Sequence, residues 1–303
     1  MNHRKNHSGC LFVFLLALAL SPAFFSCAKD YGLEEFIARE NDVNKRSTNI
    51  TDISLVPAAS SLPSQYNVLL LSDIHFGANP DHPDLPLEEF RAWFNSLKTA
   101  NDTSVPIEQR RPVFCICLGD SVESGAKNEY EQFKMFTEKE IEARGVPVYT
   151  ILGNHDHLNN GWDLWKKYVK PYTTYYRFKT KTFSWYFLDT ASGTMGVSQL
   201  HDFVENINAD PNPKLVFTHY PIYGGGGNFY FSLSDPQERA LLIDTLANSN
   251  VKLVAEGHQH PGSSHDFGLF NEQNIAAFRD YQSWHILTVD EKSATVNIVH
   301  KTP

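Results

Sequence analysis

Short, continuous apolar runs between helical patterns are the feature that most limits the fold of this chain. Two such runs, residues 68–71 and 113–118, are typical of strands that are buried on both faces. Strands and helices that alternate along the chain predict a layered α/β fold, and one folded domain is the simplest arrangement. Cys115 and Cys117, two apart in the second run, are poorly placed for a mutual disulfide and are expected as small core residues. The other expected strands are 148–152, 173–178, 182–188, 214–218 and 251–255, and the expected helical stretches are 87–100, 129–143, 161–168, 198–207 and 236–247, with short antiparallel strands after about 275.

The first residues carry the pattern of an export signal. Arg4 and Lys5 precede an apolar run, residues 11–20, which is too short to span a bilayer comfortably and is typical of the h-region of a signal peptide. Cys27 follows a small residue after this run, which resembles the lipobox of bacterial lipoproteins, although two aromatic residues shortly before it depart from that pattern. Ordinary cleavage nearby, with Cys27 as a bystander, is the alternative.

The expected organisation has three parts. Residues 1–26 form the signal peptide, residues 27–64 form a polar tether with the lipid on Cys27, and residues 65–303 form the folded domain. The protein is then an exported lipoprotein of the periplasm or the cell surface, and the membrane is its partner through the lipid anchor.

The net charge argues against one class of partner. It is −9 at pH 7 in a chain of otherwise ordinary globular composition. A polyanion such as duplex DNA would meet a repulsive field, so nucleic acid is not expected as a substrate or partner. A local metal site can still bind a small phosphate within a globally acidic protein.

Each of five predicted strands ends in a cluster of potential metal ligands. In open α/β sheets, sites collect outside the carboxyl ends of the strands, so these side chains can converge without long loops. Carboxylate, amide and imidazole ligands suit zinc, manganese or iron, and the absence of a thiolate disfavours a structural zinc site. Taken alone, most of these clusters are weak signals, and only Gly257-His258-Gln259-His260 is moderately specific for metal, but five in order indicate a metal centre. The clusters are Ser72-Asp73-Ile74-His75, Gly119-Asp120, Gly153-Asn154-His155-Asp156, Thr218-His219 and Gly257-His258-Gln259-His260.

The ordered set Asp-x-His, Gly-Asp, Gly-Asn-His-Asp, His and Gly-His-x-His resembles that of the calcineurin-like metallophosphoesterase superfamily, over about residues 66–260. The resemblance implies a four-layer αββα sandwich, in which two mixed β-sheets pack face to face and are flanked by helices. It also implies two divalent or trivalent metal ions (Zn, Mn or Fe). One ion would be held by Asp73, His75, Asp120 and His260, and the other by Asp120, Asn154, His219 and His258.

The resemblance also implies roles for residues near these ligands. His155 matches the family histidine that contacts phosphate and protonates the leaving group, and Asp156 would orient its ring. A hydroxide that bridges the two ions would be the nucleophile. Glu123 stands where many members carry Asp or Tyr, which disfavours a purple acid phosphatase; it either supports the site or is a solvated helix-start carboxylate. His157 is expected to be a bystander.

These observations predict a phosphoric ester hydrolase that cleaves small phosphomonoesters such as nucleotides or sugar phosphates. Two alternatives stay open: a phosphodiesterase, and a surface lipoprotein that binds a ligand without catalysis. The second ranks last, because every expected ligand is present. A glycine-rich stretch follows His219, and its flanking Tyr223, Phe229 and Tyr230 either form part of the leaving-group pocket or are core residues.

Overall fold

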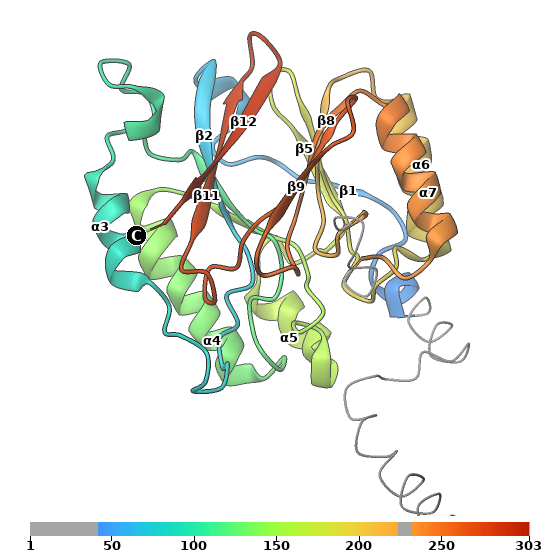
Figure 1. Ribbon diagram of the computed structural model, residues 1–303, viewed down its shortest axis with the longest axis horizontal. Helices are drawn as coiled ribbons and strands as arrows, with labels where there is room; N and C mark the ends of the chain where they lie inside the picture. The colour runs from blue at the N-terminus through green and yellow to red at the C-terminus, as the bar shows by residue number, and fades with distance from the viewer. Residues whose placement is uncertain (1–41, 224–231, 303) are drawn as a thin grey trace, which may run out of the picture. The chain divides into compact units, whose positions relative to one another are not determined.

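The computed structural model describes residues 42–223 and 232–302, which belong to one compact unit. The described chain forms two mixed β-sheets (Figure 1). The five-stranded sheet runs in the order β12 (Thr295–Lys301), β11 (Trp284–Asp290), β2 (Gln65–Leu71), β3 (Phe114–Cys117) and β4 (Val148–Thr150). The seven-stranded sheet runs in the order β1 (Thr51–Asp52), β5 (Tyr176–Lys179), β6 (Ser184–Phe187), β7 (Lys214–Phe217), β8 (Val251–Glu256), β10 (Asn271–Asn274) and β9 (Ser263–Asp266).

Parallel pairing in the middle of each sheet brings several strand ends to one edge. In the five-stranded sheet β2 pairs with β3 and β3 with β4, both parallel, while β11 and β12 add antiparallel strands. In the seven-stranded sheet β6, β7, β8 and β10 are parallel neighbours. The carboxyl ends of β2, β3 and β4, and those of β7 and β8, therefore lie at common edges.

Helices cover the outer face of each sheet, which confirms the expected four-layer sandwich (Figure 1). α3 (Leu87–Ser96), α4 (Lys127–Phe136) and α5 (Gly161–Tyr168) pack on the five-stranded sheet. α6 (Gly196–Ala209) and α7 (Pro236–Asn248) pack on the seven-stranded sheet. Short helical turns complete the set: η2 (Ala59–Ser61), η3 (Ile107–Gln109), the π-helix η4 (Thr137–Ile141), η5 (Glu142–Arg144) and η6 (Leu158–Asn160).

The hydrophobic core between the sheets explains why the strand sequences are continuously apolar. Leu70 on β2 faces the other sheet, whereas its neighbours Leu69 and Leu71 face the helices. Trp185 stacks on Phe217 in the inner layer, with ring centroids 5.5 Å apart. Both faces of these strands are thus buried, as the sequence predicted. Cys115 and Cys117 are buried and free, also as predicted.

Within the described residues, no helix combines the length and the apolar character that crossing a bilayer requires.

The segment that precedes β2 is part of the domain, so the tether predicted to reach residue 64 is wrong for residues 42–64. Val43 is fully buried, and Leu55 and Leu62 join the core between the sheets. β1 adds a parallel strand beside β5. The segment carries few apolar residues, which is why its pattern resembled a linker. The predicted signal peptide and the lipid-bearing Cys27 lie outside the described residues.

A buried ion pair fastens this segment to the domain. Arg46 donates to both carboxylate oxygens of Asp189, at 3.0 and 3.1 Å, and to Oγ of Ser192 at 3.0 Å. The side chains of Arg46 and Asp189 are 4% and 0% exposed. Although burial opposes it, the charge of Arg46 holds the pKa of Asp189 below its usual value.

Replacing Arg46 therefore tests whether the segment belongs to the fold. Arg46→Met leaves the Asp189 carboxylate buried and unpaired, so the free energy of unfolding should fall by about 3–5 kcal/mol in chemical denaturation. Lys45→Met is the matched control, because Lys45 pairs with Asp42 on the surface and should change stability by less than about 1 kcal/mol. Equal effects of the two substitutions would contradict the assignment.

Candidate metal centre

Loops after five strands bring the seven predicted metal ligands together in two neighbouring groups. The ligand atoms of Asp73, His75 and His260 lie within 4.8 Å of one another, and so do those of Asp120, His219 and His258. The seventh, Asn154, joins the second group, because its Oδ1 lies 3.0 Å from Nε2 of His219. This grouping matches the division between two ions that the family resemblance implies, in which Asn154, His219 and His258 belong to the second ion and Asp120 to both.

Asp120 connects the two groups. Its Oδ2 lies 3.3 Å from Nε2 of His219 and 3.8 Å from Nε2 of His75. Its Oδ1 accepts a hydrogen bond from the backbone N–H of His155 at 2.8 Å. The carboxylate is almost fully buried and contacts side chains from loops of both sheets. A bridging position between two ions is consistent with this geometry.

The backbone around the centre adopts conformations that most residues avoid. Four of the seven predicted ligands have positive φ angles, which is uncommon for residues with a Cβ and costs on the order of 1–3 kcal/mol each. Such strain persists only where the surroundings hold it, and it concentrates at functional sites. The four are Asp73 (φ 52°), His75 (φ 51°), Asp120 (φ 48°) and His258 (φ 69°).

Two glycines let these loops approach each other closely. Gly119 has φ +91°, and a Cβ there would lie 2.5 Å from Nδ1 of His219. A Cβ on Gly153 would lie 2.1 Å from the backbone nitrogen of Asp120. Any side chain at either position would therefore push the ligand loops apart.

Three of the histidines are held through their second ring nitrogen. In each case Nδ1 contacts an oxygen, so Nε2 is the nitrogen that can bind a metal. Such contacts fix the ring orientation and the tautomer of a ligand. The pairs are His75 with Oε2 of Glu123 (2.8 Å), His219 with the carbonyl of Leu118 (2.7 Å) and His260 with Oδ2 of Asp280 (2.5 Å).

The two supporting carboxylates, Glu123 and Asp280, differ in whether the sequence pointed to their roles. Glu123 was left open between a supporting residue and a solvated one, and its contact with His75 favours the supporting role. Asp280 was missed. It lies in no motif and follows its partner His260 by 20 residues, beyond the last recognisable cluster.

The electrostatics of the groups indicate a site that requires cations. Burial opposes it, but the hydrogen bond to Glu123 and the nearby carboxylates raise the pKa of His75 to about 9. Asp120 likewise raises the pKa of His219 to about 9 against the effect of burial. Burial and the neighbouring His219 lower the pKa of His258 to about 3. The centre therefore attracts protons when no other cation is bound.

The donor atoms of the centre fit metal ions as the cations that it requires. The buried Nε2 of His75 has no hydrogen-bond partner among the described residues, and it lies between Oδ1 of Asp73 (3.9 Å) and Oδ2 of Asp120 (3.8 Å). A buried polar atom without a partner is costly unless a ligand satisfies it. Imidazole nitrogens with carboxylate and amide oxygens suit zinc, manganese or iron.

His155 lies beside these groups at a more exposed position. Its ring centroid is 4.8 Å from that of His75, and its side chain is 32% exposed. Its Nδ1 contacts the backbone carbonyl of Glu123 at 2.7 Å. Because a carbonyl can only accept, Nδ1 carries a proton, and Nε2 is the nitrogen that can meet a substrate.

Asp156 does not orient the ring of His155, contrary to the expectation. Its carboxylate accepts hydrogen bonds from the backbone N–H groups of Gly153 (2.8 Å) and Val122 (3.1 Å). Burial and the charge of Asp120 raise its pKa to about 7. Asp156 thus ties the loops after β3 and β4 to each other, a role that its position in the motif does not distinguish from a catalytic one.

Two further expectations concern residues near the centre. His157 contacts the carbonyl of Ala191 through Nε2 at 3.1 Å, which is consistent with a bystander. The ring of Tyr223 packs against those of His265 (4.9 Å) and Phe267 (5.4 Å) and is partly exposed. The predicted pocket residues Phe229 and Tyr230 lie outside the described residues.

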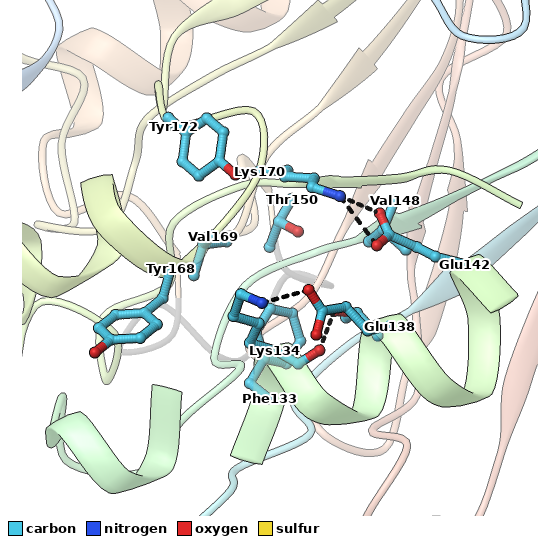
Figure 2. A pocket seen from close by; sticks show the side chains of 11 residues that line it. Phe133, Lys134, Glu138, Glu142, Val148, Thr150, Tyr168, Val169, Lys170 and Tyr172 are labelled. Carbon is cyan, nitrogen blue, oxygen red and sulfur yellow. Dashed lines mark hydrogen bonds and ion pairs between the residues drawn. The ribbon is translucent and has the colours of Figure 1, made fainter. Parts of the chain in front are cut away.

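A separate cavity of about 140 Å³ lies between α4, η4 and the end of α5 (Figure 2). Lys170 pairs with Glu142 at 2.8 Å, and Lys134 pairs with Glu138. The charged side chains around it therefore satisfy one another. No predicted site residue lines it, so it plays no part in the metal centre.

The raised pKa values predict that metal binding depends on pH. Metal ions must displace the protons of His75 and His219, so the apparent affinity should rise with pH and level off only above about pH 9, where both are neutral. The expected slope between pH 6 and 8 is up to about tenfold per pH unit for each displaced proton. Competition titrations with Mn²⁺ or Zn²⁺ measure it, and an affinity that is constant over this range would contradict the assignment.

The sequence pattern of the family described as calcineurin-like phosphoesterase matches residues 66–262. A Fibrobacter succinogenes protein, named a probable cyclic nucleotide phosphodiesterase, is 30% identical over 194 residues, which cover 63% of this chain and 71% of that protein.

Solved structures agree on the fold. A dimetal phosphatase from Danio rerio matches with a TM-score of 0.54 at 13% identity, covering 78% of this chain and 98% of that one. GAP50, the anchor in the inner membrane complex of Plasmodium, matches with a TM-score of 0.53 at 15% identity, covering 78% and 88%. At these identities the likeness shows the fold alone. With the match over residues 66–262, the chain belongs to the calcineurin-like phosphoesterase family of phosphoric ester hydrolases.

Proposed function

We propose that the protein hydrolyses small phosphate esters at a centre of two metal ions. The observation that supports this most strongly is the pair of ligand groups joined by Asp120, with His155 at the exposed side. When bound, the ions would activate water and neutralise charge on the phosphoryl group. The first would be held by Asp73, His75, Asp120 and His260, and the second by Asp120, Asn154, His219 and His258.

The chain's own contribution to catalysis is the placement of a proton donor. The carbonyl of Glu123 accepts a hydrogen bond from Nδ1 of His155, so Nε2 is the ring atom that, when protonated, can donate to a substrate. An imidazole in this position can donate to the oxygen of the leaving group, and positioned general acids accelerate such reactions by about 10²–10⁴-fold. The exposure of the ring allows a substrate to reach it.

The class of ester has two candidates. Phosphomonoesters such as nucleotides or sugar phosphates are the expectation from the sequence. Phosphodiesters are favoured by one specific observation, the 30% identical relative that is named a probable cyclic nucleotide phosphodiesterase. Both candidates use the same metal ions and the same proton donor.

Hydrolysis of p-nitrophenyl phosphate and of bis-p-nitrophenyl phosphate tests both candidates. The domain should turn over at least one ester with Mn²⁺ or Zn²⁺ and lose activity with chelator. His155→Gln should lower kcat by about 10²–10⁴-fold with metal content unchanged, because it removes the proton donor alone. His201→Gln, on the exposed surface of α6, is the control. An undiminished kcat in His155→Gln would contradict the proposed role.

We further propose that the protein is exported and anchored to a membrane through Cys27. The basic residues, the apolar run and the cysteine that follows them support this. Expressed as the full chain in a bacterium, the wild-type protein should partition with membranes and detergent. Cys27→Ser should release most of it into the aqueous fraction, because it removes the attachment point of the proposed lipid anchor. Equal membrane association of both forms would contradict the proposal.

A further inference from the structure

The segment that connects β10 to β11, residues 276–282, lies along the ligand loops of both sheets. The backbone N–H of Ala277 donates to the carbonyl of His260 at 2.9 Å, and that of Phe278 donates to the carbonyl of Ser72 at 2.8 Å. The first carbonyl belongs to the loop after β8 and the second to the loop after β2. This connecting segment lies beyond residue 262, where the family pattern ends.

The connecting segment also holds the loop of residues 77–86, here called the rim loop. Arg279 donates to the carbonyl of Ile74 at 2.9 Å, just before the loop, and to that of Pro83 at 3.0 Å. Gln282 donates to the carbonyl of Asp84 at 2.8 Å. The rim loop is therefore fixed at several points to the same segment that contacts His260.

Asp280 in the connecting segment joins a metal-binding histidine to a histidine of the rim loop. Its Oδ2 lies 2.5 Å from Nδ1 of His260, and its Oδ1 lies 2.9 Å from Nδ1 of His82. One carboxylate thus holds both rings. Because a shift of Asp280 would move both imidazoles, the placement of His82 depends on the same group as the placement of His260.

His82 lies near the first metal group and is accessible. Its Nδ1 and Nδ1 of His260 contact the two oxygens of one carboxylate, that of Asp280. Its side chain is 39% exposed, whereas that of His75 is 5% exposed. With Nδ1 directed to Asp280, Nε2 of His82 is the nitrogen that can meet an oxygen of an arriving ligand.

We propose that Asp280 is a positioning residue that fixes His82 and His260 as one unit, and that His82 contacts an oxygen of the phosphate ester. This inference rests on the proposed function and adds a substrate-binding residue to it. The alternative is that Asp280 and His82 only fasten the rim loop. That alternative predicts a change in stability without a change in metal or phosphate affinity, so the two can be separated.

The experiment compares His82→Gln and Asp280→Asn with the control His201→Gln in the full folded chain. It measures Mn²⁺ affinity, the affinity of the Mn²⁺-loaded protein for inorganic phosphate by calorimetry, and KM and kcat for both nitrophenyl esters. Asp280→Asn should weaken Mn²⁺ binding by about 10–100-fold, the usual effect of removing a group that orients a metal ligand. His82→Gln should leave Mn²⁺ affinity unchanged and raise KM and the phosphate Kd about tenfold, with little change in kcat.

Two results would overturn the inference. In one, His82→Gln matches His201→Gln in KM and in phosphate Kd. In the other, Asp280→Asn retains wild-type Mn²⁺ affinity and loses only thermal stability, which is the result expected if Asp280 only stabilises the rim loop. If the wild-type protein hydrolyses neither ester, the proposed function fails, and the Mn²⁺ and phosphate affinities still decide the roles of Asp280 and His82.

Discussion

The buried carboxylate of Asp120 is the group around which the rest of the centre is arranged. It faces His219, from a loop of the seven-stranded sheet, and His75, from a loop of the five-stranded sheet, and it accepts the backbone N–H of His155. A buried carboxylate needs compensating positive charge and hydrogen bonds. The same requirement that holds Asp120 in place therefore determines where cations would bind and where His155 lies beside them.

The fold meets this requirement by bringing strand ends from two sheets to one place. The aromatic layer between the sheets, with Trp185 stacked on Phe217, holds them face to face. The ligand loops can then be short, but their backbones must accept left-handed conformations, as Asp120 does with φ 48°. Gly153 is required because even a Cβ would meet the backbone of Asp120. The strained positions are stable because the packed sheets support them.

The fold and the convergence of the seven candidate ligands were predictable because their signals are local. Apolar runs such as 68–71 indicated strands buried on both faces, and each ligand cluster followed its strand directly in the sequence. Asp280 carries no such signal, because only the tertiary fold brings it to His260. Asp156 follows His155 directly in its motif, but its carboxylate accepts hydrogen bonds from backbone amides and does not orient the ring of His155. Residues 42–64 carry no such signal, because tertiary contacts hold them, among them the buried pair of Arg46 with Asp189 and the burial of Leu55 and Leu62 in the core.

The most direct test of the two-metal centre is the stoichiometry of metal binding to the metal-free domain, measured by calorimetry together with elemental analysis. The metal-free domain should bind two equivalents of Mn²⁺ or Zn²⁺. Asp73→Asn and Asn154→Ala should each leave one tight site, because each belongs to one group, and Asp120→Asn should weaken both. A wild-type stoichiometry of one or none, or two tight sites retained in Asp120→Asn, would contradict the two-metal centre.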